Sequence, residues 1–135
     1  MIIQLTYFSR PRDFGPAILA SMLEASRRNN RRDEVTGALL CHGALYLQWL
    51  EGPHLAVTAT LGRILSDPRH ERIELLCCHE ASVRLFPDWD LRHDPSGSWL
   101  WTEAAARAGA LDTITPETSR ALFERLAAQV EPARV

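Results

Sequence analysis

Two apolar segments with the alternation of β-strands, residues 35–42 (VTGALLCH) and 44–51 (ALYLQWLE), follow one another almost directly in this chain. The short His42-Gly43 connection between them predicts a β-hairpin. An isolated hairpin is marginally stable in water, so this one must bury its faces against other elements. The segments on either side of the hairpin therefore decide the fold.

Each side of the hairpin supplies helix and strand patterns. Residues 17–28 carry apolar side chains three and four positions apart, as in an amphipathic helix, and we expect Asn29-Asn30 to end it. The order β-α-β-β-α-β-β predicts an α+β, ferredoxin-like fold, with an antiparallel sheet and two helices on one face. We expect strands at 2–8, 35–42, 44–51, 72–79 and 88–92, and helices at 17–28 and 54–66.

The last third of the chain is predicted to cover the other face of the sheet. Residues 99–110 are rich in alanine, and Thr115-Pro116-Glu117 has the residue order of a helix start. We therefore divide the chain into a core at 1–95 and a C-terminal helical extension at 96–135. The second predicted helix of this extension has an apolar stripe made of Leu122, Phe123, Leu126, Ala127 and Val130.

Length and charge exclude several classes of protein. A chain of 135 residues fits one domain, and a formal net charge of -2 gives no electrostatic reason to expect a nucleic-acid partner. The basic run from Arg27 to Arg32 is followed at once by Asp33-Glu34. We interpret that run as the solvated end of a helix, where cations face the negative pole of the helix dipole.

The sequence also predicts a cytoplasmic protein. Its first ten residues lack the basic and long apolar regions of a signal peptide, and no segment approaches the ~18 apolar residues of a membrane span. The three cysteines, Cys41, Cys77 and Cys78, form no CxxC motif and lie in apolar runs. We expect them to be reduced and to behave as small buried hydrophobic residues.

Gln48 is a polar residue inside an apolar strand. Strand alternation places Tyr46, Gln48 and Leu50 on one face, and both faces of the sheet are expected to be covered. A buried amide without a partner costs about 1–3 kcal/mol, so Gln48 needs one. Tyr7 on the first strand, which lies beside the third in this fold, can supply it. The two residues either satisfy each other within a core or face a bound ligand.

Further polar residues favour a ligand. The adjacent amides of Asn29 and Asn30 can meet the alternating carbonyl and N–H groups at the edge of a ring. Arg63 and Asp67, four residues apart, form either a surface ion pair or the polar edge of a site for a heterocycle between the helices.

Evidence for catalysis is weak. The five histidines lack metal-ligand spacing, the cysteines have no adjacent basic activator, and no nucleotide-binding glycine motif occurs. A hydrolase of the acylphosphatase type shares the expected topology. It requires a phosphate-binding loop after the first strand, and residues 9–12 contain no glycine for one.

The chain resembles the BLUF family of flavin-based blue-light sensors, in its short single-domain form. The resemblance covers roughly the first two-thirds of the chain. It is carried in order by LTYFS at 5–9, ASRRNN at 25–30, VTGALL at 35–40, LQWLEG at 47–52, RILSDPRH at 63–70 and RLFPDWDL at 84–91.

The resemblance implies a non-covalent flavin between the two early helices, most often FAD, with FMN or riboflavin as alternatives. It implies that Tyr7 and Gln48 form the light-sensing pair, with Ser9 and Trp89 nearby. The residues it implies for flavin contacts are Asn29, Asn30, Gln48, Arg63, Ile64 and Asp67. Leu91 departs from the family pattern, which often has methionine at that position.

The implied function is that of a sensor and not of an enzyme. Light would drive reversible electron and proton transfer from Tyr7 and leave Gln48 in a different hydrogen-bonding arrangement. The signal would pass to an unidentified partner protein or through self-association, without a membrane. The alternative is a ferredoxin-like interaction module without flavin, in which Tyr7 and Gln48 only satisfy each other.

Overall fold

Strands and helices follow one another in the predicted order. A computed structural model describes residues 1–12, 16–42, 45–88, 91–93 and 115–128. The strands are β1 (Ile2–Pro11), β2 (Thr36–His42), β3 (Leu45–Gly52), β4 (His70–Ala81) and β5 (Arg92–His93), and the helices are α1 (Pro16–Asp33), α2 (His54–Leu65) and α4 (Pro116–Ala128).

The strands form one sheet in the order β4-β1-β3-β2-β5. β1 lies beside β3 as predicted, and the first four strands pair antiparallel. The prediction of a strand at 88–92 in an antiparallel sheet is wrong: β5 starts at Arg92 and pairs parallel with β2. Pro87 and Asp88 lie in a turn, so the predicted strand cannot begin at Asp88.

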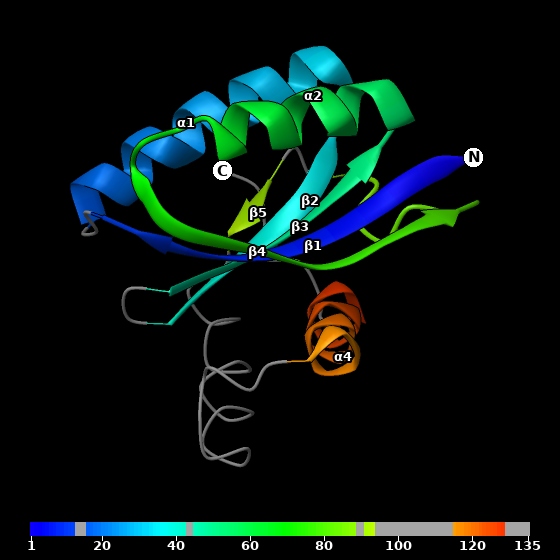
Figure 1. The fold of residues 1–135 in the computed structure, drawn as a ribbon. Coiled ribbons are helices and arrows are strands. Elements are labelled where there is room, and N and C mark those ends of the chain that lie inside the picture. Colours follow the sequence, from blue (N-terminus) through cyan, green and yellow to red (C-terminus); the bar gives the residue numbers. More distant parts are fainter. Residues whose placement is uncertain (13–15, 43–44, 89–90, 94–114, 129–135) are drawn as a thin grey trace.

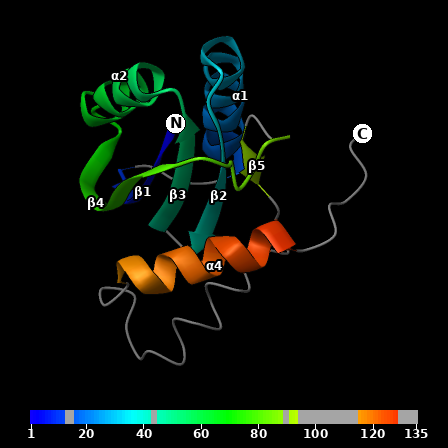
Figure 2. The same cartoon turned by 90° about the vertical axis from the view of Figure 1, so that its right-hand side faces the viewer.

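Helices cover both faces of this sheet. α1 and α2 lie side by side on one face and α4 crosses the other, in both views (Figures 1 and 2). Strand alternation on β3 separates the two cores as predicted, because Leu50 packs with the α2 side and Trp49 with α4. The predicted fold class and the layering of the described elements are therefore confirmed.

α1 continues beyond the predicted end at Asn29-Asn30, through one more turn to Asp33. Glu34 has a φ of 59°, and the Val35 N–H donates to the Asn30 carbonyl at 2.9 Å. A left-handed residue followed by this bond is the Schellman ending of a helix. Glycine is its usual signal, and the absence of glycine here explains why the sequence suggested an earlier end.

α4 begins as predicted. The Thr118 N–H donates to Thr115 Oγ1 at 3.1 Å, so Thr115 caps the helix and Pro116 occupies its first turn. Leu122, Phe123 and Leu126 are buried, and the Phe123 ring centroid lies 5.5 Å from that of Trp49. The predicted helix at 99–110 and Val130 lie outside the described residues.

The cysteines follow the prediction only in part. Cys41 and Cys77 are half-buried, but Cys78 is exposed. The expectation of burial is wrong for Cys78, because β4 is the edge strand of the sheet and one side of it faces solvent.

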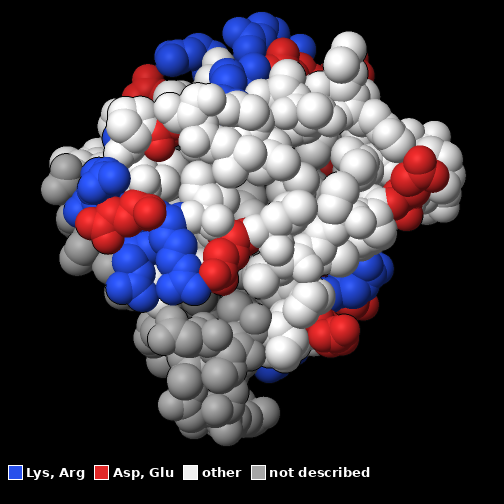
Figure 3. Space-filling model, in the orientation of Figure 1, with Lys and Arg blue, Asp and Glu red and all other residues white. Residues whose placement is uncertain are grey.

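Charges on the surface are mixed. On the face drawn in Figure 3, acidic and basic side chains lie next to one another around a broad uncharged area, so that face has no field of a single sign. Within the described part of the chain, no helix has the length and apolar character needed to cross a bilayer.

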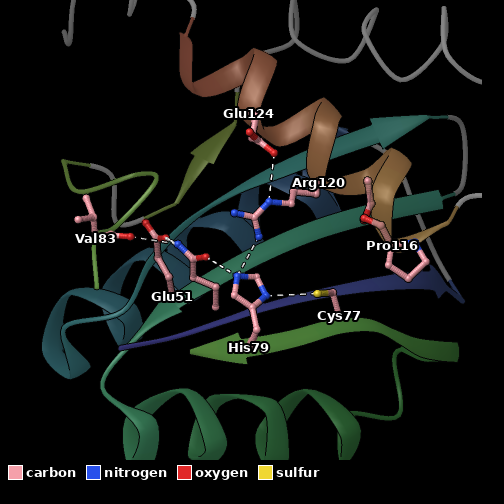
Figure 4. Close-up of polar contacts among 9 residues, drawn as sticks. Glu51, Cys77, His79, Val83, Pro116, Arg120 and Glu124 are labelled. Atoms are coloured by element: carbon pink, nitrogen blue, oxygen red, sulfur yellow. Dashed lines mark hydrogen bonds and ion pairs between the residues drawn. The ribbon is translucent and has the colours of Figure 1, made fainter. Parts of the chain in front are cut away.

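A buried carboxylate lies on the α4 side of the sheet, and the sequence reasoning missed it. Glu51, labelled in Figure 4, is fully buried. It accepts hydrogen bonds from Trp49 Nε1, Gln4 Nε2 and the backbone N–H groups of Leu85 and Phe86. Because a buried charge needs such partners, this cluster ties β1 and β3 to the segment after β4. Strand alternation could have predicted this burial, since Glu51 lies on the same strand face as Trp49.

Candidate functional site

A cavity of about 210 Å³ lies among α1, α2 and the sheet. Its walls combine side chains from both helices with side chains from the middle of β1 and β3. Seven residues that the sequence singled out line it together: Tyr7, Asn29, Asn30, Gln48, Arg63, Ile64 and Asp67.

Tyr7 and Gln48 form the floor of the cavity. They face each other across β1 and β3, and the Tyr7 hydroxyl donates to Gln48 Oε1, as strand alternation predicts. Both side chains are buried, at 3% and 7% exposure. Burial, and then the charge of Asp67, raises the pKa of Tyr7 well above its ordinary value, so the phenol keeps its proton. No hydrogen-bond partner for Gln48 Nε2 is found among the described residues.

α1 contributes the two adjacent amides. Asn29 and Asn30 both line the cavity, and Asn30 is only 2% exposed. They lie one turn before the end of α1 and not at its terminus, so the underside of a continuous helix holds them over the sheet.

Arg63 and Asp67 do not form the surface ion pair that their spacing allowed. Because α2 ends at Leu65, Asp67 lies outside the helix. The two side chains therefore do not lie one helical turn apart, as an i,i+4 ion pair requires. Arg63 instead bonds Asp33 of α1 at 3.0 Å and Thr60 Oγ1 at 3.2 Å. Asp67 pairs with Arg69, whose hydrogen bonds lower the pKa of the Asp67 carboxyl.

Ser9 adjoins the cavity through another residue. Ser9 is fully buried and does not line the cavity. Its hydroxyl is hydrogen-bonded to Nδ1 of His70, and His70 lines the cavity. Burial lowers the pKa of His70 and favours its neutral form, although the charge of Asp67 acts in the opposite direction. Trp89, the remaining predicted residue, lies outside the described residues.

Sequence reasoning missed several lining residues. Tyr46, Thr60 and His70 all line the cavity. Tyr46 could have been identified, because it shares a strand face with Gln48 and carries a polar atom. Thr60 and His70 gave no comparable signal, since only the tertiary structure brings them to this point.

The cavity is chemically suited to a planar heterocycle with polar edges. Apolar walls come from residues such as Ile64, while amides, a guanidinium and a carboxylate converge from three elements. In the ranges that the structure describes, no three His, Cys, Asp or Glu side chains lie close enough together to hold a metal ion. The arrangement supports binding by hydrogen bonds and packing, with a phenol–amide pair at its floor.

Fold and cavity together define an α+β ligand-binding protein of ferredoxin-like topology. Residues 2–92 match the family described as "BLUF: Sensors of blue-light using FAD". The chain therefore belongs to the BLUF family of flavin-based blue-light sensors.

Similar proteins include the "Blue light- and temperature-regulated antirepressor BluF" of Escherichia coli (strain K12), 38% identical over 87 residues, which are 64% of this chain and 22% of that protein. "Photoactivated adenylate cyclase subunit beta" of Euglena longa is 28% identical over 91 residues, which are 67% of this chain and 11% of that protein. The chain thus spans about a quarter or less of these relatives.

A solved structure matches almost the whole chain. "BlrB - a BLUF protein, dark state structure" is 33% identical, with a TM-score of 0.82 over 94% of this chain and 96% of that one. The alignment with this structure covers a larger share of the chain than the family match does.

Proposed function

We propose that this protein is a blue-light photoreceptor that holds a flavin non-covalently in the cavity among α1, α2 and the sheet. The observation that supports this most is the Tyr7–Gln48 hydrogen bond at the cavity floor, between a buried phenol and an amide whose nitrogen has no partner among the described residues. A pair that only stabilised a core would not need to line a cavity.

The polar groups of the cavity fit the edges of a flavin ring. No partner for the donor Gln48 Nε2 is found among the described residues, and this nitrogen is open to the cavity that Gln48 lines. Asn29, Asn30, Arg63 and Asp67 supply the mixture of donors and acceptors that alternating carbonyl and N–H groups require. Ile64 supplies an apolar contact for the face of the ring.

The chemistry rests on the two residues at the floor. When bound, a flavin supplies absorption of blue light and an excited state that accepts an electron. Tyr7 would give up an electron and pass its hydroxyl proton toward Gln48, and both would return when the charges recombine. Because an amide has a donor end and an acceptor end, Gln48 can finish this cycle rotated or tautomerised, with its neighbours bonded differently.

The output is proposed to be a protein partner and not a reaction catalysed by this chain. Such a partner, or a second copy of the chain, would detect a changed surface as in other two-state switches. Trp89 and Ser9 are proposed to lie near the photoactive pair. We propose residues 1–95 as the photosensor core and 96–135 as the extension that reports its state.

FAD is the proposed flavin. FAD, FMN and riboflavin share the ring system that the cavity would hold. Riboflavin carries the ring and its ribityl chain, FMN adds one phosphate, and FAD adds the rest of the dinucleotide. Comparing the Kd values of riboflavin, FMN and FAD would show whether groups beyond the ring contribute to affinity.

One experiment tests the function directly. Absorption spectra of the FAD-loaded protein are recorded before and after blue light. We expect a small reversible red shift in the parent, and no shift in Tyr7→Phe or Gln48→Leu. A protein that takes up no FAD, or loaded variants that shift like the parent, would contradict the proposal.

A further inference from the structure

The chain contains two tyrosines, and both line the same cavity. Tyr46 lies two residues before Gln48 on β3, and Tyr7 lies opposite Gln48 on β1. Side chains two apart on a strand share a face, so Gln48 has a phenol as its neighbour both along its own strand and across the sheet. The function proposed above uses only Tyr7.

The two phenols differ in how their hydroxyls are satisfied. The hydroxyl of Tyr7 donates to Gln48 Oε1. Tyr46 is just as buried, at 5% exposure, but its hydroxyl has no hydrogen-bond partner among the residues that the structure describes. That hydroxyl is not shut off from the cavity, because Arg10 Nε is the one fully buried side-chain polar atom without a partner in the described part of the chain.

The surroundings of Tyr46 hold its ring in place. The ring packs with Leu23 of α1, Leu39 of β2 and Leu91, so its apolar part is fully used in the core. Phenylalanine would satisfy these contacts equally well. The hydroxyl is the one part of Tyr46 that this packing does not explain.

The polar neighbour on β2 does not explain the hydroxyl either. Cys41 is paired in register with Tyr46. Burial raises the pKa of the Cys41 thiol to about 12, so the sulfur stays protonated and is a weak acceptor. Burial, and then the proximity of Cys41, also raises the pKa of Tyr46, so its hydroxyl remains a donor.

We propose that Tyr46 is a ligand-binding residue, whose hydroxyl donates a hydrogen bond to an acceptor atom of the bound flavin ring. This inference rests on the proposed flavin site. With Gln48 Nε2, the Tyr46 hydroxyl gives the cavity two donors on one strand, two residues apart, for which the described residues supply no acceptor. Two such donors would restrict the rotation of a bound planar ring, which a single donor cannot do.

The test compares Tyr46→Phe with Tyr7→Phe, since each variant removes one hydroxyl and leaves the ring. Thermal unfolding of the ligand-free proteins is measured first, and then the Kd of riboflavin by quenching of its fluorescence. For Tyr46→Phe we expect an unchanged unfolding midpoint and a Kd raised about fivefold, the value of one neutral hydrogen bond. Tyr7→Phe should lower the midpoint of the ligand-free protein, because Gln48 Oε1 loses its donor.

Each result has a distinct meaning. If the parent binds no riboflavin, FMN or FAD, the proposed function fails and this inference fails with it. If the parent binds riboflavin and Tyr46→Phe has the same Kd, the inference alone is wrong. It is also wrong if Tyr46→Phe lowers the ligand-free midpoint as much as Tyr7→Phe, because the hydroxyl then has a structural role.

Discussion

The bond between Tyr7 and Gln48 is a stabilising contact as well as a photochemical one. Gln48→Leu in the ligand-free protein leaves the 3%-exposed Tyr7 without an acceptor. We expect a loss of about 1–3 kcal/mol in the free energy of unfolding, measured by urea denaturation. The double variant Tyr7→Phe/Gln48→Leu should recover part of this loss, because neither partner is then left unpaired. Additive losses would show that the pair is not coupled.

Leu91 is a second residue whose replacement gives a defined expectation. It is 1% exposed, packs with Leu23, Leu39 and Tyr46, and its carbonyl accepts a bond from Arg27 Nε at 3.1 Å. Leu91→Met keeps the volume and adds a thioether, so stability should change by less than about 1.5 kcal/mol. We expect the red shift to persist, with altered dark recovery and light-minus-dark vibrational bands. Identical recovery and bands would refute this expectation.

Among the elements, β4 and α4 meet at a histidine with competing contacts. Gln4 Nε2 donates to Glu51 and to the Val83 carbonyl, which turns Gln4 Oε1 toward His79 Nε2 at 2.7 Å (Figure 4). That nitrogen therefore donates, although Arg120 Nη1 of α4 also lies 2.9 Å away. Cys77 Sγ lies 3.3 Å from Nδ1, the other ring nitrogen.

This arrangement predicts that α4 is held less firmly in acid. Burial, and then the charge of Arg120, lowers the pKa of His79 below its ordinary value of about 6.5. The unfolded chain therefore binds a proton more readily than the folded chain. The contribution of His79 to the free energy of unfolding is fully present above about pH 6.5, and it is lost as the pH drops through the folded-state pKa. A protonated His79 would face the Arg120 cation, whose charge Glu124 offsets in part.

The pH expectation can be isolated from other histidines. Thermal midpoints are measured from pH 8 to pH 5 for the parent and for His79→Gln, which keeps a polar side chain but does not titrate. Because burial lowers the pKa of His70 too, both proteins should lose stability in acid, and the parent should lose more. Parallel curves would show that His79 does not couple β4 to α4.

At the scale of the whole molecule, one sheet carries two cores. Phe123 of α4 is fully buried and contacts Trp49 and Phe86 on the face opposite the cavity. Phe123→Ala should reduce the free energy of unfolding by about 3–5 kcal/mol, measured in urea. Ala121→Gln, at an exposed position of the same helix, should change it by less than about 0.5 kcal/mol. Similar losses in both variants would mean that α4 does not contribute to the core.

Sequence patterns predicted the features that depend on neighbouring residues. Alternation along β3 assigned Gln48 and Trp49 to opposite faces, and the Thr115-Pro116 start of α4 was recognisable from its local chemistry. The order of elements then placed β1 beside β3, which was enough to pair Tyr7 with Gln48.

Features that depend on distant partners could not be predicted in this way. Arg63 has its partner Asp33 on another helix, 30 positions away, although a carboxylate four residues away offered a simpler pairing. Glu51 receives backbone donors from Leu85 and Phe86, in a segment without a strand or helix pattern. The end of α1 depends on the left-handed backbone of Glu34, which few sequences adopt without glycine or asparagine.

Consecutive residues of β3 reach the cavity on one face of the sheet and the α4 core on the other. Gln48 and Trp49 are consecutive, and their α-carbons are about 3.8 Å apart. One side chain reaches the cavity floor, and the other lies beneath Arg120 and against Phe123. A conformational change at the cavity does not need a chain of intermediate residues to reach the α4 core. The distance to cross is the thickness of a single strand, so a rotation of the peptide plane between Gln48 and Trp49 would move side chains on both faces of the sheet.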